Sequence, residues 1–216
     1  VRTASTLNVS GASNLTTTGA ITLGAATGTG VINASTMTGN LVMGAAAVGV
    51  RTITGGAGAD TILGDNQVST LTGGDGIDNI TGGSAVDTIF GGSGVDTING
   101  SLGADDVDGG IGNDIFNYTS AQLLAATTID GGDGTNRLSM QSIVAVADAQ
   151  FALKSNIQLL TSAAAGLSAT LSANAAATGI TTVTLAGTGA IADTVTITGG
   201  ALGFATGAIT VNLDTS

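Results

Sequence analysis

The stretch from Gly55 to Asn117 reads GGAGADTIL GDNQVSTLT GGDGIDNIT GGSAVDTIF GGSGVDTIN GSLGADDVD GGIGNDIFN, which is seven nine-residue units joined without an insertion. The sixth position is Asp in six of the seven units and Ser69 in the second. A period held over this length predicts a repeat architecture in which each unit packs on the next. The eighth position is always apolar, at Ile62, Leu71, Ile80, Ile89, Ile98, Val107 and Phe116.

The composition argues against an ordinary layered core. The 216 residues include 36 Gly and no Pro, Cys, His or Trp, and aromatic residues make up 2% of the chain. Domains of this length normally bury large aromatic and branched side chains, whereas the apolar residues here are mostly Ala, Ile, Leu and Val in short runs. Such runs are typical of a solenoid with a thin interior.

The acidic residues favour a metal partner. All fifteen are Asp, and twelve of them lie between Asp60 and Asp133. Only four basic residues oppose them, so the formal net charge is −11. Folding would bring unpaired carboxylates together unless cations lie between them, which favours a divalent metal and disfavours nucleic acid. A solvated acidic face is the alternative, but it would mix Glu with Asp and would not follow the nine-residue period.

The units resemble the G-G-x-G-x-D-x-U-x pattern of the repeats-in-toxin (RTX) proteins. A looser copy, GGDGTNRLS, follows at 131–139, where Asn136 replaces the sixth-position Asp. The resemblance implies a parallel β-roll with two units per turn and calcium as the bound ion. The implied calcium-binding residues are Asp60, Asp78, Asp87, Asp96, Asp105, Asp114 and Asp133, with the turn glycines Gly56, Gly58, Gly74, Gly76, Gly83, Gly92, Gly94, Gly103, Gly110 and Gly112.

Two units per turn would place alternate sixth positions on opposite edges of the roll. The resemblance therefore implies one edge with Asp60, Asp78, Asp96 and Asp114 and a second with Ser69, Asp87 and Asp105. Calcium takes about six to eight oxygen ligands, which two carboxylates and several backbone carbonyls can supply. Because the unit at 64–72 lacks two glycines and the Asp, we expect the second edge to be partly empty near Ser69, with a break in the ladder. Arg51 falls in the same register, where it either caps the acidic stack or is a surface residue beside it.

The flanking sequence predicts further β-structure, so the expected fold class is all-β. We expect solenoid rungs at 1–54, the calcium-binding β-roll at 55–139 and further rungs at 140–216. Ser120 would begin one or two helical turns, and 145–155 would form a short helix or irregular bridge with a face of Val146, Phe151 and Leu153. The expected strands are 6–10, 20–23, 31–34, 41–43, 52–54, 157–161, 169–171, 180–185, 194–198 and 208–213, the last three beginning fourteen residues apart.

Catalytic motifs give no support for an enzyme. The chain has no His or Cys, no G-x-S-x-G elbow and no phosphate-binding G-K-[ST] loop. The neighbouring carboxylates of Asp105, Asp106 and Asp108 could act as an acid/base pair in isolation, but they lie in the calcium register and no Trp platform for a sugar accompanies them. We therefore predict a non-enzymatic protein.

A second resemblance is compositional. The Thr-, Ala- and Gly-rich segments GVINASTMTGNLVMG, NIQLLTSAAA and GITTVTLAG around the repeat are similar to the lattice-forming part of calcium-dependent surface-layer (S-layer) proteins of Gram-negative bacteria. This resemblance implies a structural protein of the bacterial cell surface that assembles with copies of itself, with cell-surface polysaccharide as a further partner. The alternative is an RTX adhesin, or the accessory module of a type I-secreted enzyme or toxin.

The ends of the chain carry little targeting information. No run of about 18 apolar residues could span a membrane, and the chain begins at Val1 without a Met. We expect it to be a processed product or a segment of a longer, exported protein.

Overall fold

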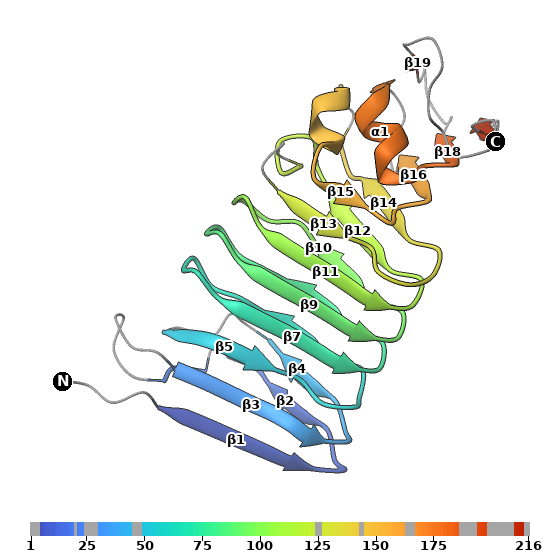
Figure 1. Cartoon of the computed structure of the whole chain (residues 1–216). Helices are drawn as coiled ribbons and strands as arrows, with labels where there is room; N and C mark the ends of the chain where they lie inside the picture. The colour runs from blue at the N-terminus through green and yellow to red at the C-terminus, as the bar shows by residue number, and fades with distance from the viewer. Residues whose placement is uncertain are drawn as a thin grey trace.

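The chain folds as a parallel β-solenoid of about seven turns in which 6% of the residues are helical. The computed structural model describes residues 5–19, 21–23, 30–44, 49–123, 127–142, 145–162, 167–185, 194–197 and 210–213. Figure 1 shows the turns stacked along one axis, with the N-terminal strands at one end and the short helices near the other. Among the described helices, none is long and apolar enough to cross a membrane.

Two parallel sheets face each other across the solenoid; up to Ser155 each complete turn adds one strand to each, and after it only the second of these sheets gains further strands among the described residues. Sheet A contains β1 (Thr6–Gly11), β3 (Gly30–Met37), β5 (Val50–Thr54), β7 (Thr70–Asp75), β9 (Thr88–Ser93), β11 (Asp106–Ile111), β13 (Thr128–Asp130) and β15 (Lys154–Ser155). Sheet B contains β2 (Leu15–Thr17), β4 (Leu41–Met43), β6 (Thr61–Leu63), β8 (Asn79–Thr81), β10 (Thr97–Asn99), β12 (Ile115–Tyr118), β14 (Arg137–Met140), β16 (Leu159–Ser162), β18 (Thr182–Leu185) and β20 (Thr210–Leu213).

The strand register confirms that two nine-residue units make one turn. In sheet A, Thr70 is paired with Thr88 and Thr88 with Asp106, and in sheet B Ile62 is paired with Ile80 and Ile80 with Ile98. Each step is eighteen residues. Because side chains alternate between the faces of a strand, this register places every eighth-position side chain on the inner face.

The core is a narrow double column of those inner side chains. Ile62, Ile80, Ile98 and Phe116 stack from sheet B, and Leu71, Ile89 and Val107 face them from sheet A. All are 2% exposed or less. Strands β6 and β10 of sheet B each bury one side chain between two partly exposed ones, so a turn has little apolar area with which to hold its loops in place.

The turns become longer and less regular outside the repeat. Ile115 of β12 pairs with Arg137 of β14, which is a longer step than the eighteen residues of the repeat. Thr182 of β18 pairs with Thr210 of β20, and this step is twice the predicted spacing of fourteen. The reason is that the intervening β19 (Thr194–Ile197) belongs to a separate small sheet with β17 (Ser168–Leu171).

Several local predictions are wrong. Residues 21–23 form no strand; β2 lies earlier in the chain, where it pairs with β4. At the helix predicted from Ser120, the described residues form a hydrogen-bonded turn that begins at Thr119, where the Gln122 side chain accepts the Thr119 backbone N–H and the Leu123 N–H donates to the Thr119 carbonyl; residues 124–126 of that prediction lie outside the described residues. Parts of three predicted strands, at Ala20, Thr198 and 208–209, lie outside the described residues.

The helical segments lie near the C-terminal end of the described solenoid. The 3₁₀ helix η1 (Asp148–Phe151) confirms the expected short helix, with Val146 and Phe151 buried. Leu153 is 60% exposed rather than part of the apolar face, and its φ of 68° turns the chain away from the helix. The helix α1 (Ala173–Thr178) was not predicted from its sequence ANAAAT.

Candidate metal-binding edges

The loops on one side of the repeat, here called the first edge, bring four Asp side chains into a column. These loops precede β6, β8, β10 and β12 and contain Asp60, Asp78, Asp96 and Asp114. The backbone N–H of each Asp donates to the Oδ1 atom of the next: Asp60 to Asp78 at 2.8 Å, Asp78 to Asp96 at 2.8 Å, and Asp96 to Asp114 at 2.9 Å. The predicted stacking along this edge is confirmed.

The second oxygen of these carboxylates has a different environment. The Oδ2 atoms of Asp78, Asp96 and Asp114 are buried and have no hydrogen-bond partner within the described structure. Asp60 differs because its Oδ2 accepts the Gly56 N–H at 2.7 Å. A buried carboxylate oxygen without a donor is costly and requires an explanation, of which an ion is one.

The loops opposite form the second edge, which precedes β7, β9 and β11. Ser69 N–H donates to Asp87 Oδ1 at 2.8 Å, and Asp87 N–H donates to Asp105 Oδ1 at 3.0 Å. The Oδ2 atoms of Asp87 and Asp105 also have no hydrogen-bond partner among the described residues. Both edges therefore repeat one arrangement, with Oδ1 fixed by the backbone and Oδ2 left for another ligand.

Ser69 interrupts the column of carboxylates on the second edge as predicted, but it does not interrupt the strand pairing. The Ser69 hydroxyl donates to the Gln67 carbonyl of its own loop. The strand ladder continues past this loop, since β5 pairs with β7 in register, so the expected break lies in the carboxylate column alone. Arg51 lies one turn before Ser69 and forms an ion pair with Asp65 at 3.6 Å, which places its charge beside the interrupted end of the column.

Burial changes the protonation of the columns. Desolvation, with added repulsion from the neighbouring carboxylates of Asp96 and Asp60, raises the pKa of Asp78 to about 7 against the lowering effect of the Asp60 N–H bond. Burial likewise raises the pKa of Asp87 and of Asp96 to about 6. The pKa values of Asp105 and Asp114 shift in the same direction for the same reason. Ionisation of the stacked carboxylates is thus unfavourable in the absence of a cation, and a bound cation would favour the ionised form.

The turn glycines allow neighbouring loops to approach closely. Gly92, with φ of 115°, lies so close to the Gly74 carbonyl oxygen that a Cβ on Gly92 would collide with it. The same holds for Gly94 and the Gly76 carbonyl oxygen. Gly74, Gly76, Gly83, Gly103, Gly110 and Gly112 also have positive φ, and Gly56 and Gly58 in the first loop do not. Only glycine fits both the backbone angle and the spacing, and the loops so formed carry closely stacked carbonyl groups.

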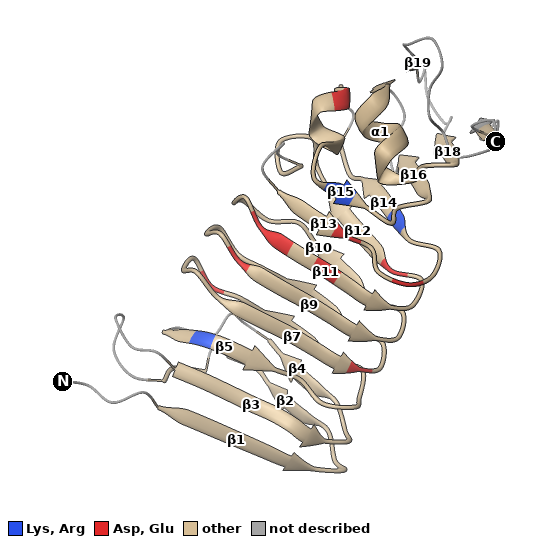
Figure 2. Ribbon diagram, in the orientation of Figure 1, with Lys and Arg blue, Asp and Glu red and all other residues tan. Residues whose placement is uncertain are grey.

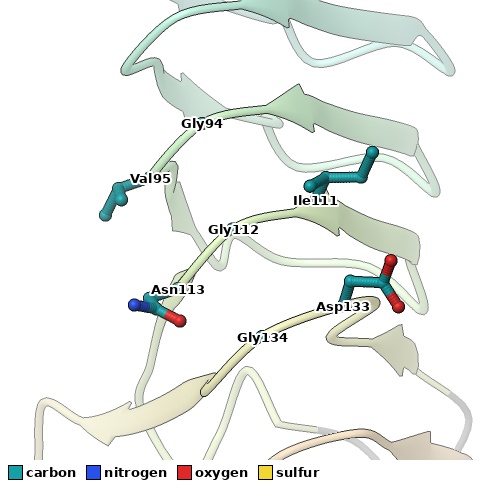
Figure 3. Close-up of a pocket in the computed structure, with 7 residues that line it drawn as sticks. All are labelled: Gly94, Val95, Ile111, Gly112, Asn113, Asp133 and Gly134. Carbon is teal, nitrogen blue, oxygen red and sulfur yellow. The ribbon is translucent and has the colours of Figure 1, made fainter.

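Asp133 lies apart from the column. It occupies the third position of its loop, and its side chain is exposed. Figure 3 shows it on the rim of a shallow hollow whose floor is Gly94, Gly112 and Gly134, beside Ile111 and across from Val95 and Asn113. Its assignment as a calcium ligand stays a prediction.

The donor set suits a hard cation that takes mainly backbone oxygens. Within the described residues, no three Asp side chains converge on one point as a ready-made metal cluster. The available ligands on each edge are the Oδ2 atoms together with loop carbonyls, which is an all-oxygen set of the kind that calcium prefers. Figure 2 shows most of the described acidic residues along the middle turns of the solenoid and one on the helical segment beside α1, with basic residues on β5, β14 and β15.

Sequence reasoning missed how the first column continues. Asp114 N–H donates to Asn136 Oδ1 at 2.9 Å, and Asn136 N–H donates to Gln158 Oε1 at 2.7 Å. The substitution at Asn136 was visible in the looser copy, but Gln158 lies in no repeat and only the structure aligns it. A neutral amide therefore replaces the carboxylate in the next two turns.

Comparison with protein families supports the metal identity. The model of the RTX calcium-binding nonapeptide repeat matches residues 52–71, 68–98 and 81–116 of this chain. Comparisons with curated proteins and with solved structures find no significant match. The chain thus contains a β-roll built from RTX calcium-binding nonapeptide repeats.

Proposed function

We propose that calcium ions bind along both edges of the β-roll and hold its turns together, and that the loaded roll is a structural element of a cell-surface protein. The observation that carries this proposal is the set of buried Oδ2 atoms at Asp78, Asp87, Asp96, Asp105 and Asp114, which have no hydrogen-bond partner in the described structure. On the first edge the repeat positions the Oδ2 atoms of Asp78, Asp96 and Asp114 next to loop carbonyls, and the repeats are of the calcium-binding kind.

The role of the protein residues is to present oxygens in a fixed arrangement. The backbone N–H of the preceding turn orients each carboxylate through Oδ1, so Oδ2 points to the same place in every turn. The glycines bring carbonyl groups of successive loops within reach. When bound, calcium supplies positive charge that offsets the repulsion between stacked carboxylates and links loops that the thin core holds weakly.

The finer proposal is that loaded copies assemble into an S-layer lattice. Support comes from exposed apolar side chains beside the metal loops on both edges: Ile77, Val95 and Ile111 on the first, and Val68, Val86 and Leu102 on the second. Ile77 and Val95 are spaced by one turn, as are Val68 and Val86. The first edge of one copy could therefore face the second edge of the next, a heterologous contact that builds open rows of molecules.

Electron microscopy of the purified chain with and without calcium tests both levels of the proposal. We expect ordered sheets only with calcium. Monomers that fold on calcium addition would support the calcium roll and reject the lattice in favour of an RTX adhesin or an accessory module. A chain that neither binds calcium nor changes its β circular dichroism in strong chelator would contradict the whole proposal.

A further inference from the structure

Five successive loops of the first edge place a side-chain atom at the same point. This atom is Oδ2 in the first four loops and Nδ2 of Asn136 in the fifth. A Cβ added to Gly109 would lie 2.6 Å from Asp114 Oδ2 and 2.7 Å from the Gly131 carbonyl oxygen. A Cβ added to Gly131 would lie 2.6 Å from Asn136 Nδ2 and would collide with the Asn156 carbonyl oxygen. The two loops thus superpose atom for atom around their first glycine.

The chemistry at this point differs between the two loops. In the loop of Asp114, a carboxylate oxygen and a carbonyl oxygen share the space with no donor between them. In the loop of Asn136, the amide Nδ2 donates to the Asn156 carbonyl at 3.0 Å and approaches the Gly132 carbonyl at 3.4 Å. Asn136 is 0% exposed, and its Oδ1 accepts the Asp114 N–H as the aspartates do for their neighbours. An N–H donor therefore satisfies the carbonyl that would otherwise face a cation.

We propose that the Asn136 amide, whose Nδ2 lies where the other loops have Oδ2, replaces the ion as the partner of the neighbouring carbonyl and ends the calcium column of the first edge. This inference rests on the proposed calcium binding and adds a boundary to it: Asp114 is the last carboxylate ligand of the first edge, and the turn of Asn136 closes without metal, so Asp133 in that turn would not be a calcium ligand. One side-chain atom, nitrogen in place of oxygen, decides whether that turn requires calcium. An aspartate at position 136 would recreate the oxygen pair found in the preceding loop and add one site.

The turns that follow also have uncharged or basic side chains where the repeat has carboxylates. Gln158 continues the column with a second neutral amide that accepts the Asn136 N–H. On the second edge, Thr127 takes the sixth position after Asp105, and the buried ammonium of Lys154 donates to its carbonyl. On both edges, therefore, the carboxylates of the repeat are followed by side chains that have hydrogen-bond donors.

The test is the number of calcium ions bound by the full chain and its Asn136→Asp variant, measured by equilibrium dialysis. We expect the variant to bind one ion more than the wild type. Its melting temperature should fall below that of the wild type in chelator and recover when calcium is added. Asn113→Asp is the matched control, because it adds the same charge one residue from Asp114, on an exposed side chain outside the column. It should leave the number of ions unchanged.

A second variant separates loss of structure from gain of a site. Asn136→Ala removes the amide without supplying a ligand, so its lower melting temperature should not recover on adding calcium beyond the change seen in the wild type. Equal ion counts in the wild type and Asn136→Asp, with both variants responding to calcium alike, would overturn the inference while leaving the calcium roll intact. A wild-type chain that binds no calcium would instead contradict the proposed function.

Discussion

The loops at 109–114 and 131–136 are neighbours in one solenoid and start with the same two glycines, yet the hydrogen bonding of their sixth-position side chains differs. In the first, the sixth-position side chain accepts a backbone N–H with one oxygen and leaves the other buried without a partner. In the second, the amide accepts with its oxygen and donates with its nitrogen. On the proposal above, the first loop takes a cation from solution, whereas the second carries its own donor.

This difference divides the described solenoid into two kinds of turn. The turns of 55–117 are short, all eighteen residues, with a thin core and carboxylate columns on both edges. The later turns are longer and have additional packing, as where Asp148 of η1 accepts N–H groups at the start of α1, from Ser172 at 2.7 Å and Ala175 at 3.1 Å. We infer that regular short turns are stable only with an ion at each edge, whereas longer turns obtain stability from added contacts.

Removal of calcium should therefore produce the largest effect, and only in the repeat. A site with a dissociation constant of about 0.1 mM adds about 1.4 kcal/mol at about 1 mM calcium, so four sites add about 6 kcal/mol, similar to the stability of a typical domain. Hydrogen exchange followed by mass spectrometry should show loss of amide protection across 55–117 in chelator and retained protection in 128–162. Equal loss in both regions would contradict the division.

Exchange of one carboxylate for an amide should convert a turn of the first kind into one of the second. Asp78→Asn keeps the Oδ1 acceptor for the Asp60 N–H and places a donor where Oδ2 lacks one. We expect it to be more stable than the wild type in chelator, by about 1–3 kcal/mol, and to bind at least one calcium ion fewer. The melting temperature of Asp78→Asn should therefore lie above that of the wild type in chelator and below it in calcium.

Asp65→Asn is the control for that exchange. Asp65 is acidic and lies in the repeat, but its carboxylate contacts Arg51 and the Gln67 N–H rather than a column. Its substitution should cost less than about 1 kcal/mol and should not change the number of ions bound. If Asp65→Asn and Asp78→Asn lowered calcium binding equally, the column assignment would be wrong.

The extent to which sequence predicted this structure follows the same division. Within 55–117 the nine-residue period determines which side chains share an edge, so the sequence alone predicts the stacking of Asp60, Asp78, Asp96 and Asp114. Outside it, the step between paired strands varies: Val42 pairs with Thr61, close to the spacing of the repeat, whereas Thr182 pairs with the much more distant Thr210. Positions such as Gln158 then have no register in the sequence, and their place depends on how much chain each turn inserts.

Acidity should affect the calcium-free and calcium-bound roll in opposite directions. The pKa values of Asp78, about 7, and of Asp87 and Asp96, about 6, lie above the ordinary value of 3.8 in the folded chain. A raised folded pKa means that the folded state retains protons that the unfolded state releases, so this contribution to stability is complete below 3.8 and is lost as pH rises through 6 to 7.

Melting temperatures of calcium-free protein should accordingly be higher at about pH 5 than at about pH 8, and the difference should be smaller in Asp78→Asn. In excess calcium the order should reverse, because protons then compete with the ion for the same oxygens. A calcium-free melting temperature that rises with pH over this range would show that the columns are not the groups that titrate.

The smallest effect is expected from repair of the second column at Ser69. Ser69→Asp would restore the sixth-position carboxylate, and its backbone N–H already donates to Asp87 Oδ1. The loop around it still lacks the glycines that let carbonyls stack, since Asp65 and Gln67 occupy their positions, and Arg51 already supplies positive charge nearby. We therefore expect a gain in calcium affinity worth less than about 1 kcal/mol, measured by calorimetry.

The double change Ser69→Asp with Gln67→Gly should bind more tightly than either alone, because the carboxylate and the carbonyl act on the same ion. A full-strength site from Ser69→Asp alone would show that the carboxylate, and not the glycine loop, limits binding on this edge.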